Sequence, residues 1–573
     1  MNPLVSDRYV DHLLARVLDL DALFALPRFT ELGVDSVKPW MDSCRRVARD
    51  VLFPNYRAID AHPPKFADGK ITVHPAMHDC WRALRELDVI EAVHAMPLSI
   101  TTLSSAYLMA GNLSAYGYAG LTAGAAHLIE AFASDELKNT FLSKMRSGEW
   151  TGTMALTEPH AGSSLGDLTT RATPTGGGHH LIRGAKIFIS AGDHDLAENV
   201  VHLTLARIDG APAGTKGISL FAVPRVRPDG KRNDVHVTGA IHKIGWRGLP
   251  SLALAFGEDN DCHGWLVGPP HQGLRCMFQM MNEARIMVGV NGASTASVAF
   301  HESLAYAKER KQGRPLKGGD PSQPQVALTE HADVRRMLLR QKAIVEGSLG
   351  LLAITSEFAD LAAWSADEAQ QHRAKQLLDL LTPIAKTFPA ERGFESNALA
   401  LQLHGGNGYS SEFLPEAWLR DQKLNTIHEG TTTIQGLDLL GRKVVAGGGA
   451  ALGLLVETIE GDCAKSKLDV TALREAVQTL VMTTTELGGR GLEGDVEGMM
   501  GHSADFLEAM SSIAIAWVWV RVTNALVDDD DFAKGLRAAA NYWAATELPK
   551  AVASLKLCSS GERSFLDARA EWF

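Results

Sequence analysis

The sequence predicts a mainly helical protein with a β domain in its middle. Helical periodicity is seen in residues 37–52 and 135–145, and it returns in the second half of the chain. Between these regions, residues 200–206, 217–223 and 251–256 are rich in residue types that favour strands, and Gly, Pro and Asp turns separate them. The order of these patterns predicts a helical, a β and two further helical regions.

We therefore expect four domains in the 573 residues. They are a helical domain over residues 1–150, a β domain over 151–270, a helical bundle over 271–445 and a C-terminal helical extension over 446–573. The count agrees with a usual domain size of about 150 residues. The glycine-rich run 446–453 is expected to be a linker and not a phosphate-binding loop, because no Lys-Ser/Thr pair follows its glycines.

Composition excludes several classes of protein. The formal net charge is −11, which gives no electrostatic reason for nucleic acid to bind. The 6 cysteines form no C-x-x-C pair and no metal-ligand spacing, so we expect buried thiols, a reducing compartment and no metal site. Asp and Arg interrupt the N-terminal residues where an export signal would be apolar. These observations predict a cytoplasmic protein.

An uncharged stretch, residues 92–129, raises the alternative of a membrane span, because it contains no Asp, Glu, Lys or Arg. A span normally needs about 20 continuous apolar residues. This stretch is interrupted by Pro97, by several glycines and by many Ser and Thr residues. The sequence therefore favours buried helices of a large helical domain and no membrane span. The run 513–520 is too short to span and is expected to be a core helix.

Two segments contain more small and polar residues than a structural role requires. Residues 154–168 offer hydroxyls and close backbone N–H groups, which suit an anionic or strongly hydrogen-bonding ligand. Residues 401–435 combine a Gly-Gly pair with an isolated carboxylate, Glu429, beside Gly430 and three threonines. Residue types alone leave open whether the first segment is an ordinary turn and whether Glu429 is a helix cap or a base.

Together these segments resemble the acyl-CoA dehydrogenase family. The family's A-L-T-E-P-x-A-G-S-D, N-G-x-K-x-W-I-T-N and E-G-T motifs all have counterparts here, in the family's order. The matching segments are residues 155–164, 183–192, 217–221, 243–246, 305–316, 401–409 and 419–431. The longer N-terminal region, residues 333–347 and the C-terminal extension resemble the large bacterial branch, which includes broad-range fatty acyl-CoA and methylmercaptopropionyl-CoA dehydrogenases.

The resemblance implies a fold with an N-terminal helical domain, a β-barrel-like middle domain, a four-helix bundle and an extra C-terminal helical domain. It implies FAD-dependent α,β-dehydrogenation of an acyl-CoA to the 2-enoyl-CoA, as in fatty acid β-oxidation, with electron-transferring flavoprotein as the acceptor. By match to the family's I-Y-E-G-T motif, Glu429 removes the α-proton while flavin N5 accepts the β-hydride. Burial among apolar groups would raise the pKa of this carboxyl toward the range useful for a base.

The resemblance also implies which residues hold the ligands. Thr157 contacts the pyrimidine edge of the flavin, Phe188 covers the ring, Ser190 lies near N5 and Ser163 reaches the pyrophosphate. The FAD of a neighbouring subunit is contacted by Arg310, Gln402, Gly405 and Gly406, so a homodimer is implied. The C-terminal extension is expected to limit further assembly. The expected cofactor residues are Ala155, Leu156, Thr157, Gly162, Ser163, Phe188, Ser190, Arg310, Gln402, Gly405, Gly406, Thr431 and Thr433. The expected substrate residues are Ser163, Arg285, His428 and Gly430.

Several positions depart from the family's pattern. Ser164 replaces Asp, and the family's Phe after Arg310 is missing. Phe188 replaces Trp and Ser190 replaces Thr, which keeps a π-face and a hydroxyl donor. His428 replaces the Tyr beside the base, either as a flat wall of the pocket or as a second titratable group that tunes Glu429.

One alternative base and two alternative functions accompany this interpretation. Some family members carry the base on an earlier helix, directly before an Arg. Here that position is Ala284, and Glu283 lies one residue away, about 100° around a helix. Glu283 is therefore an alternative base or a salt-bridged carboxylate.

Flavin monooxygenases of the same fold are one alternative function, and they need no Glu-Gly-Thr base. Non-catalytic flavoproteins of this fold, some of them associated with DNA, do not fit the net charge of −11.

Overall fold

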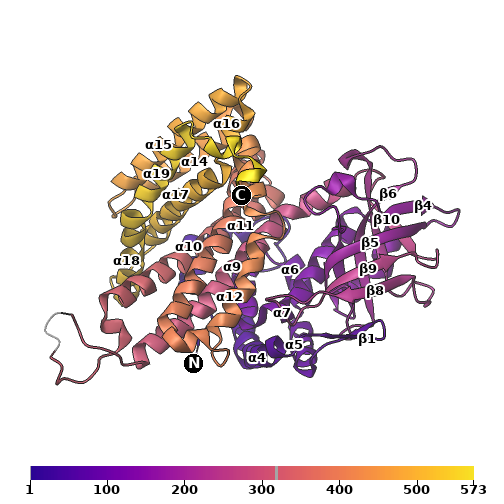
Figure 1. The fold of residues 1–573 in the computed structure, drawn as a ribbon, viewed down its shortest axis with the longest axis horizontal. Coiled ribbons are helices and arrows are strands. Elements are labelled where there is room, and N and C mark those ends of the chain that lie inside the picture. The colour runs from indigo at the N-terminus through magenta and orange to yellow at the C-terminus, as the bar shows by residue number, and fades with distance from the viewer. Residues whose placement is uncertain (1, 317–319) are drawn as a thin grey trace. The chain divides into compact units, whose positions relative to one another are not determined.

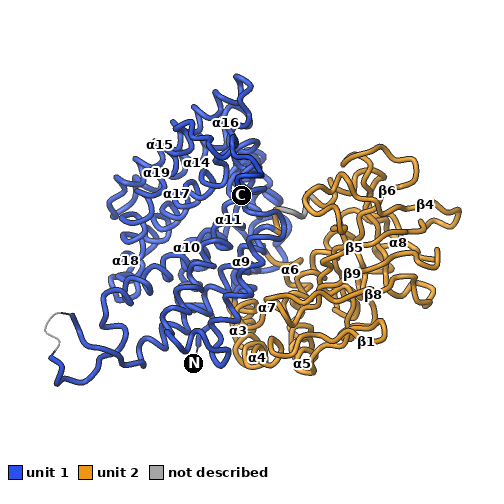
Figure 2. Tube along the Cα trace, viewed as in Figure 1, with its two compact units in different colours: residues 1–37, 97–106, 285–573 blue, residues 38–96, 107–284 orange. Residues whose placement is uncertain are grey.

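The computed structural model describes residues 2–316 and 320–573, without the side chains of residues 278–281. The chain divides into two compact units, which Figure 2 shows in blue and orange. Unit 1 consists of residues 1–37, 97–106 and 285–573, and unit 2 consists of residues 38–96 and 107–284. Each unit thus draws together segments that lie far apart in the sequence.

Unit 2 contains the β-rich region that the sequence predicts (Figure 1). Its main sheet is formed by β3 (Trp150–Ala155), β4 (Arg171–Pro174), β5 (His180–Ser190), β6 (Asn199–Ile208), β7 (Ile218–Pro224), β8 (Val235–Ala240), β9 (Ser251–Phe256) and β10 (His263–Val267). β10 pairs with β7 along one edge and with β5 along the other, and β7, β6, β4 and β5 follow one another in between. The strands therefore close into a ring, which confirms the prediction of a β-barrel-like region.

Both faces of β6 are buried. Val201, Leu203 and Leu205 share a hydrophobic cluster with Phe141 of α8 (Asp135–Arg146). Alternate side chains of a strand point to opposite faces, and Ala206 on the other face belongs to a second cluster with residues of β5, β7 and β9. This double burial anchors the ends of the strands, from which the loops of the candidate site extend.

The other elements of unit 2 are short, and two long helices pass from one unit into the other. Unit 2 also contains α3 (Val37–Val47), α4 (Phe53–Ala61), β1 (Lys65–Ala67), β2 (Lys70–Thr72), α5 (Pro75–Glu86) and α6 (Val89–Ala95). The two helices that continue across the division are α7 (Leu98–Phe132) and α9 (Gly273–Glu309).

Most of the uncharged stretch forms the buried helix α7, as the sequence predicts. Asn112 interrupts it with φ −161° and ψ 98°, and its Oδ1 accepts the N–H of Ala115 at 3.0 Å, so that Asn112 caps the second part of the helix. Gly111 faces the carbonyl of Ala48, where an added Cβ would lie only 2.9 Å from the oxygen. The small residues of this stretch therefore serve close helix packing.

Among its described residues, unit 1 consists of helices and the loops between them and contains none of the named strands. Its helices are α1 (Asp7–His12), α2 (Leu20–Phe24), α10 (Ala332–Trp364), α11 (Glu368–His404), α12 (Pro415–Lys423), α13 (Thr432–Asp438), α14 (Ala450–Cys463), α15 (Thr471–Leu492), α16 (Val496–Met500), α17 (Ser503–Asn524), α18 (Asp531–Thr546), α19 (Leu548–Ser559) and α20 (Ser564–Asp567). α10 and α12 both pack on α11. α9 also approaches α11 closely, because Gly289 and Gly292 face the carbonyls of Ala385 and Pro389. These helices form the predicted bundle.

The C-terminal helices pack on this bundle and on one another. Nη1 of Arg340, in α10, donates to Oε1 of Glu547 at 2.6 Å, and both side chains are buried. Nε1 of Trp517, in α17, donates to Oδ2 of Asp462 at 2.7 Å. The helical extension that the sequence predicts is therefore part of unit 1.

In the part of the chain that the structure describes, one segment, Val496–Asn524, is long and apolar enough to cross a membrane by length and composition alone. Inside the structure, 83% of its apolar window is buried, as in the core helix of a folded domain. A second candidate arises only if Thr432–Val444 and Ala446–Cys463, which are bent by 74°, are counted as one span. The burial of α17 agrees with the core helix expected at residues 513–520.

The linker expected at the glycine-rich run 446–453 is shorter in the structure than the sequence predicts. Gly447, Gly448 and Gly449 have φ of 58°, 69° and 85°, a left-handed conformation that other residues rarely adopt. α14 already begins at Ala450, so the second half of the run is helical. All 6 cysteines are buried and none is in a disulfide, in agreement with the predicted buried thiols. The four domain boundaries expected from the sequence stay a prediction.

Candidate active site

In unit 2, the first group of expected cofactor residues lies where β3 ends. Leu156 and Thr157 follow the last residue of β3 and run beside β5, where the N–H of Ile187 donates to the carbonyl of Thr157 at 2.9 Å. The hydroxyl of Thr153 donates to the carbonyl of Ser190, the last residue of β5. The structure therefore brings Thr157 and Ser190 onto neighbouring segments.

A buried ion pair anchors the loop that follows Thr157. Nζ of Lys186 lies 2.9 Å from Oε1 of Glu158 and donates to the carbonyl of Leu156 at 3.0 Å. Thr169 and Thr170 each donate a backbone N–H and a hydroxyl to the Glu158 carboxylate. Burial raises the pKa of Glu158, but Lys186 and these donors outweigh it and hold the pKa at about 2. Glu158 therefore stays ionised and ties both ends of the loop to β5.

Phe188 occupies an irregular position in β5. The pairing of β5 with β9 shifts in register between Lys186 and Ile189, which marks a β-bulge. In this bulge Phe188 has φ 61°, a left-handed conformation that costs a residue with a side chain about 1–2 kcal/mol. Phe188 is also 61% exposed. An exposed aromatic ring on a strained backbone offers a flat apolar surface for a ligand.

The loop residues Gly162 and Ser163 leave their polar groups open to a ligand. Both are exposed, and a Cβ on Gly162 would meet no atom within 4 Å. Exposed backbone N–H groups and hydroxyls can donate to phosphate oxygens. A flavin needs an apolar ring face and hydrogen-bond donors at its edge, so Thr157, Ser163, Phe188 and Ser190 fit FAD.

In unit 1, a left-handed turn between α12 and α13 presents Glu429. Glu429 has φ 54° and Gly430 has φ 88°. Directly after them, the side chain of Thr431 accepts the N–H of Ile434 and caps α13. A Cβ at position 430 would lie 2.6 Å from Nε2 of Gln435, so both backbone and packing require glycine there. The turn thus holds Glu429 at one defined place.

Two cations act on the carboxyl group of Glu429. Glu429 is exposed, so a ligand can reach it, but the surrounding protein still removes enough water to raise the pKa of its carboxyl above the usual value. Arg285 and Lys386 act in the opposite direction, because their charges favour the carboxylate. The balance leaves a carboxyl whose pKa is raised, as a base at neutral pH requires.

The two cations differ in how they are held. Nη1 of Arg285 donates to Oδ2 of Asp438 at 3.0 Å, at the end of α13. Lys386, in α11, is fully buried, and among the described residues its Nζ has no hydrogen-bond partner. Burial lowers the pKa of Lys386 to about 8, although Glu391 and Glu429 raise it. The hydroxyl of Thr432 donates to Glu391, which connects α11 to the start of α13.

A separate group contains the residues expected to contact the FAD of a neighbouring subunit. Arg310 follows α9, Gln402 lies in the last turn of α11, and Gly405 and Gly406 follow that helix; all of them are exposed. The structure brings the two segments together, because the rings of Tyr306 and His404 stack with centroids 4.3 Å apart. Nδ2 of Asn407 also donates to the hydroxyl of Tyr306 at 3.1 Å.

The remaining expected residues lie close to Glu429 in the chain or in the other unit. His428 is half-buried, Thr431 caps α13 and Thr433 is exposed in its first turn. Glu283 belongs to unit 2, where Oε2 lies 3.5 Å from Nδ1 of His127. That contact agrees with the salt-bridged alternative given for Glu283 from the sequence.

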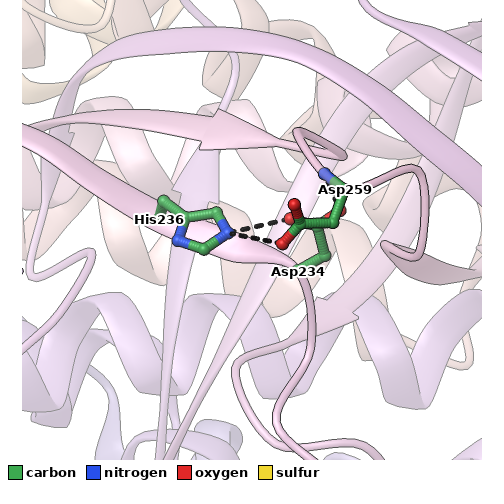
Figure 3. A group of neighbouring side chains, drawn as sticks. All are labelled: Asp234, His236 and Asp259. Carbon is green, nitrogen blue, oxygen red and sulfur yellow. Dashed lines mark hydrogen bonds and ion pairs between the residues drawn. The ribbon is translucent and has the colours of Figure 1, made fainter.

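One cluster has the ligand types of a metal site. Figure 3 shows Asp234, His236 and Asp259, whose possible ligand atoms all lie within 4.8 Å of one another. Oδ1 of Asp234 is 2.9 Å from Nε2 of His236, and Oδ2 accepts the backbone N–H of Asp259 at 2.8 Å and of Asp261 at 3.1 Å. These oxygens already hold the turn after β9, so we assign the cluster a structural role.

Sequence reasoning missed several residues that shape these sites. It gave no role to Glu158 or Lys186, although both lie inside the matched motifs. It also missed Lys386, whose only signal is a lysine in the otherwise uncharged run 383–389. Gln435 was the last residue of the second segment but received no function, because its contact with Glu429 depends on the turn between them.

Models of known families match three successive stretches of the chain. They are "acyl-CoA dehydrogenase, middle domain" over residues 153–258, "acyl-CoA dehydrogenase, C-terminal domain" over 325–444 and "acetyl-CoA dehydrogenase C-terminal like" over 455–569. The first covers β3–β9, and the second covers the turn that presents Glu429.

Curated relatives extend this likeness to nearly the whole chain. The broad-specificity linear acyl-CoA dehydrogenase FadE5 of Mycobacterium tuberculosis is 31% identical over 94% of this chain and 94% of its own length. The 3-methylmercaptopropionyl-CoA dehydrogenase of Ruegeria pomeroyi is 34% identical over 77% of this chain and 76% of its own. The solved structure of a Bacillus anthracis acyl-CoA dehydrogenase complexed with FAD matches with a TM-score of 0.71 and 18% identity, over 98% of this chain and 93% of that one.

Proposed function

Since the chain belongs to the acyl-CoA dehydrogenase family, we propose that Glu429 is the base that removes the α-proton of its substrate. The protein is an FAD-dependent oxidoreductase that dehydrogenates acyl-CoA thioesters, as the sequence predicts. The observation that carries the proposal is the position of Glu429, which is reachable by a ligand, lies in a fixed left-handed turn and has a raised carboxyl pKa beside two cations.

In the proposed reaction, the Glu429 carboxylate takes the proton from Cα. The electron pair of that C–H bond becomes the second bond of the Cα–Cβ double bond as a hydride leaves Cβ, so the product is the 2-enoyl-CoA. FAD supplies the acceptor for the hydride and its two electrons. The chain's own contribution is to orient the acyl group between base and flavin and to keep the base ionised before the reaction.

The cofactor residues keep the roles expected from the sequence. We propose that Thr157 and Ser190 donate to the flavin, that Phe188 stacks on its ring and that Ser163 binds the pyrophosphate. Ser163 and the ring of Phe188 are exposed, and Thr157 and Ser190 are half-buried, which supports these roles. Arg310, Gln402, Gly405 and Gly406 are proposed to contact the FAD of a second subunit. Their exposure and their assembly through Tyr306 and His404 support a homodimer.

The proposal also includes the electron acceptor, the cellular location and the classes of substrate. Electron-transferring flavoprotein is proposed as the acceptor that reoxidises the flavin, and the buried thiols, none of them in a disulfide, support a cytoplasmic location. The relatives' names suggest two classes of substrate, linear acyl-CoAs and 3-methylmercaptopropionyl-CoA.

An anaerobic titration of the FAD-loaded protein tests the proposed function. Linear acyl-CoAs of increasing length and 3-methylmercaptopropionyl-CoA are added, and loss of the flavin absorbance is recorded. At least one acyl-CoA should reduce the wild-type flavin at once, whereas Glu429→Gln should bind FAD and remain oxidised. Glu283→Gln serves as the matched control and should be reduced normally. Reduction of Glu429→Gln at the wild-type rate would show that another group is the base.

A further inference from the structure

We propose that Gln435 is a positioning residue that holds the Glu429 turn in its left-handed conformation and thereby aims the carboxylate at the substrate. The inference rests on the proposed function, in which Glu429 is the base. Gln435 itself lies within α13 and is fully buried, so it acts through the backbone of Glu429 and not on the substrate.

The contact between the two residues is direct. Nε2 of Gln435 donates to the backbone carbonyl of Glu429 at 3.1 Å. The backbone N–H of Gln435 donates to the carbonyl of Thr431 at 3.0 Å, within the first turn of α13. The side chain is therefore fixed by its helix and reaches back across the turn, so that one amide group spans the whole segment from Glu429 to α13.

The turn needs such a contact because its backbone is strained. Glu429 carries a side chain at φ 54°, a region that residues other than glycine and asparagine rarely adopt. Without the donor, Glu429 can relax toward an ordinary conformation, and its carboxylate would then move. Gly430 packs against the same amide, since a Cβ there would lie 2.6 Å from Nε2. Both residues of the turn, Glu429 and Gly430, thus contact the amide of Gln435.

A purely structural role explains Gln435 less well. Its Oε1 is buried and has no hydrogen-bond partner among the described residues, which is unfavourable for a core position. An apolar residue of similar length would avoid this buried, unpaired acceptor. The donor to Glu429 accounts for an amide at this position, at the start of a helix that packs on α17.

The test is Gln435→Met in the FAD-loaded protein, because methionine has a similar length but no donor. The readout is exchange of the α-proton with deuterated water in an acyl-CoA whose Cβ is replaced by sulfur, which cannot lose a β-hydride. We expect the rate of α-proton exchange in this analogue to fall by about 10-fold to 100-fold, because a displaced base loses its alignment. The kcat for an oxidisable acyl-CoA should fall by a similar factor. FAD content, the dissociation constant of the analogue and Tm should stay close to wild type.

Gln422→Met is the matched control. Gln422, in α12, is also fully buried, and its Nε2 donates to the carbonyls of Pro389 at 2.9 Å and Ala390 at 3.2 Å, away from the Glu429 turn. It should exchange the α-proton normally. The pH at which exchange is half-maximal should not change in Gln435→Met, because the substitution removes no charge.

The outcomes separate this inference from the proposed function. If Glu429→Gln stops exchange and Gln435→Met exchanges normally, only the positioning role is wrong. If Glu429→Gln exchanges normally, the proposed function itself is wrong. If Gln435→Met does not fold, Gln435→Asn replaces it, since a shorter amide keeps the polarity but cannot reach the carbonyl of Glu429. Slow α-proton exchange in Gln435→Asn supports the inference, and exchange at the wild-type rate overturns it.

Discussion

Nζ of Lys186 lies 2.9 Å from Oε1 of Glu158, and neither side chain is more than 1% exposed. Removing one partner of a buried ion pair leaves the other charge unpaired and costs about 3–5 kcal/mol. Glu158→Gln is therefore expected to lower Tm and to loosen the loop that carries Ser163. Thermal unfolding and the flavin retained after gel filtration measure the two effects.

The double variant Glu158→Gln with Lys186→Met is the control for this prediction. It removes both charges and should recover much of the lost Tm, because no buried charge then remains unpaired. If Glu158→Gln alone keeps the wild-type Tm and flavin content, the ion pair does not anchor the loop.

The same pair predicts a pH dependence of stability. The pKa of Glu158 falls from 4.5 to about 2 in the folded protein, so its contribution is complete above pH 4.5 and is lost as the pH falls toward 2. Wild type should therefore lose Tm across this window by more than Glu158→Gln does. Equal losses in both proteins would contradict the assignment.

Lys386→Met tests how the charge of the base is set. Lys386 lowers the pKa of Glu429, so removal of its charge should raise that pKa and move the acid limb of kcat/KM to higher pH. The pKa of Lys386 falls from 10.5 to about 8 on burial, so its charge disfavours the folded state below pH 8 and the variant should have a higher Tm at pH 7. A pH–rate profile and thermal unfolding check both.

Lys443→Met is the comparison for Lys386. Lys443 is also largely buried in unit 1, but it donates to the carbonyl of Asp379 at 2.6 Å and lies 3.9 Å from Asp438. Its removal should leave the acid limb in place. If the acid limb of kcat/KM moves equally in both variants, the cause is a general structural change in unit 1 and not the charge of Lys386.

Phe188→Ala is expected to weaken FAD binding by up to about 10-fold, the usual value of one aromatic stacking contact. Phe188→Trp should keep the affinity, because a larger ring offers the same apolar face. Phe66→Ala removes another exposed aromatic ring of the same unit, 40% exposed and located in β1, and should not alter FAD binding. Equal affinity in Phe188→Ala would remove Phe188 from the flavin site.

The sequence predicted much of the fold because its signals are local. Strand-favouring residue types and turn residues located β6, β7 and β9, and the absence of charge over residues 92–129 indicated the buried helix α7. The match to the family's E-G-T motif singled out Glu429, which lies in the turn before α13. In these cases the pattern and the structure depend on the same few neighbouring residues.

The parts that escaped prediction depend on contacts between distant residues. The bulge that gives Phe188 its left-handed backbone arises from the pairing of β5 with β9. Lys386 acts on Glu429 only because α11 packs near the turn before α13. Gln435 is close to Glu429 in the sequence, yet its contact exists only because Glu429 and Gly430 are both left-handed.

Exchange of the substrate's α-proton tests the central claim most directly, because it isolates proton removal from hydride transfer. Wild type, Glu429→Gln and Glu283→Gln are loaded with FAD and given the sulfur-substituted acyl-CoA in deuterated water, and deuterium at Cα is followed by mass spectrometry. Glu429→Gln should bind FAD and the analogue but exchange no proton, while Glu283→Gln should exchange like wild type. Exchange at the wild-type rate in Glu429→Gln would contradict the account.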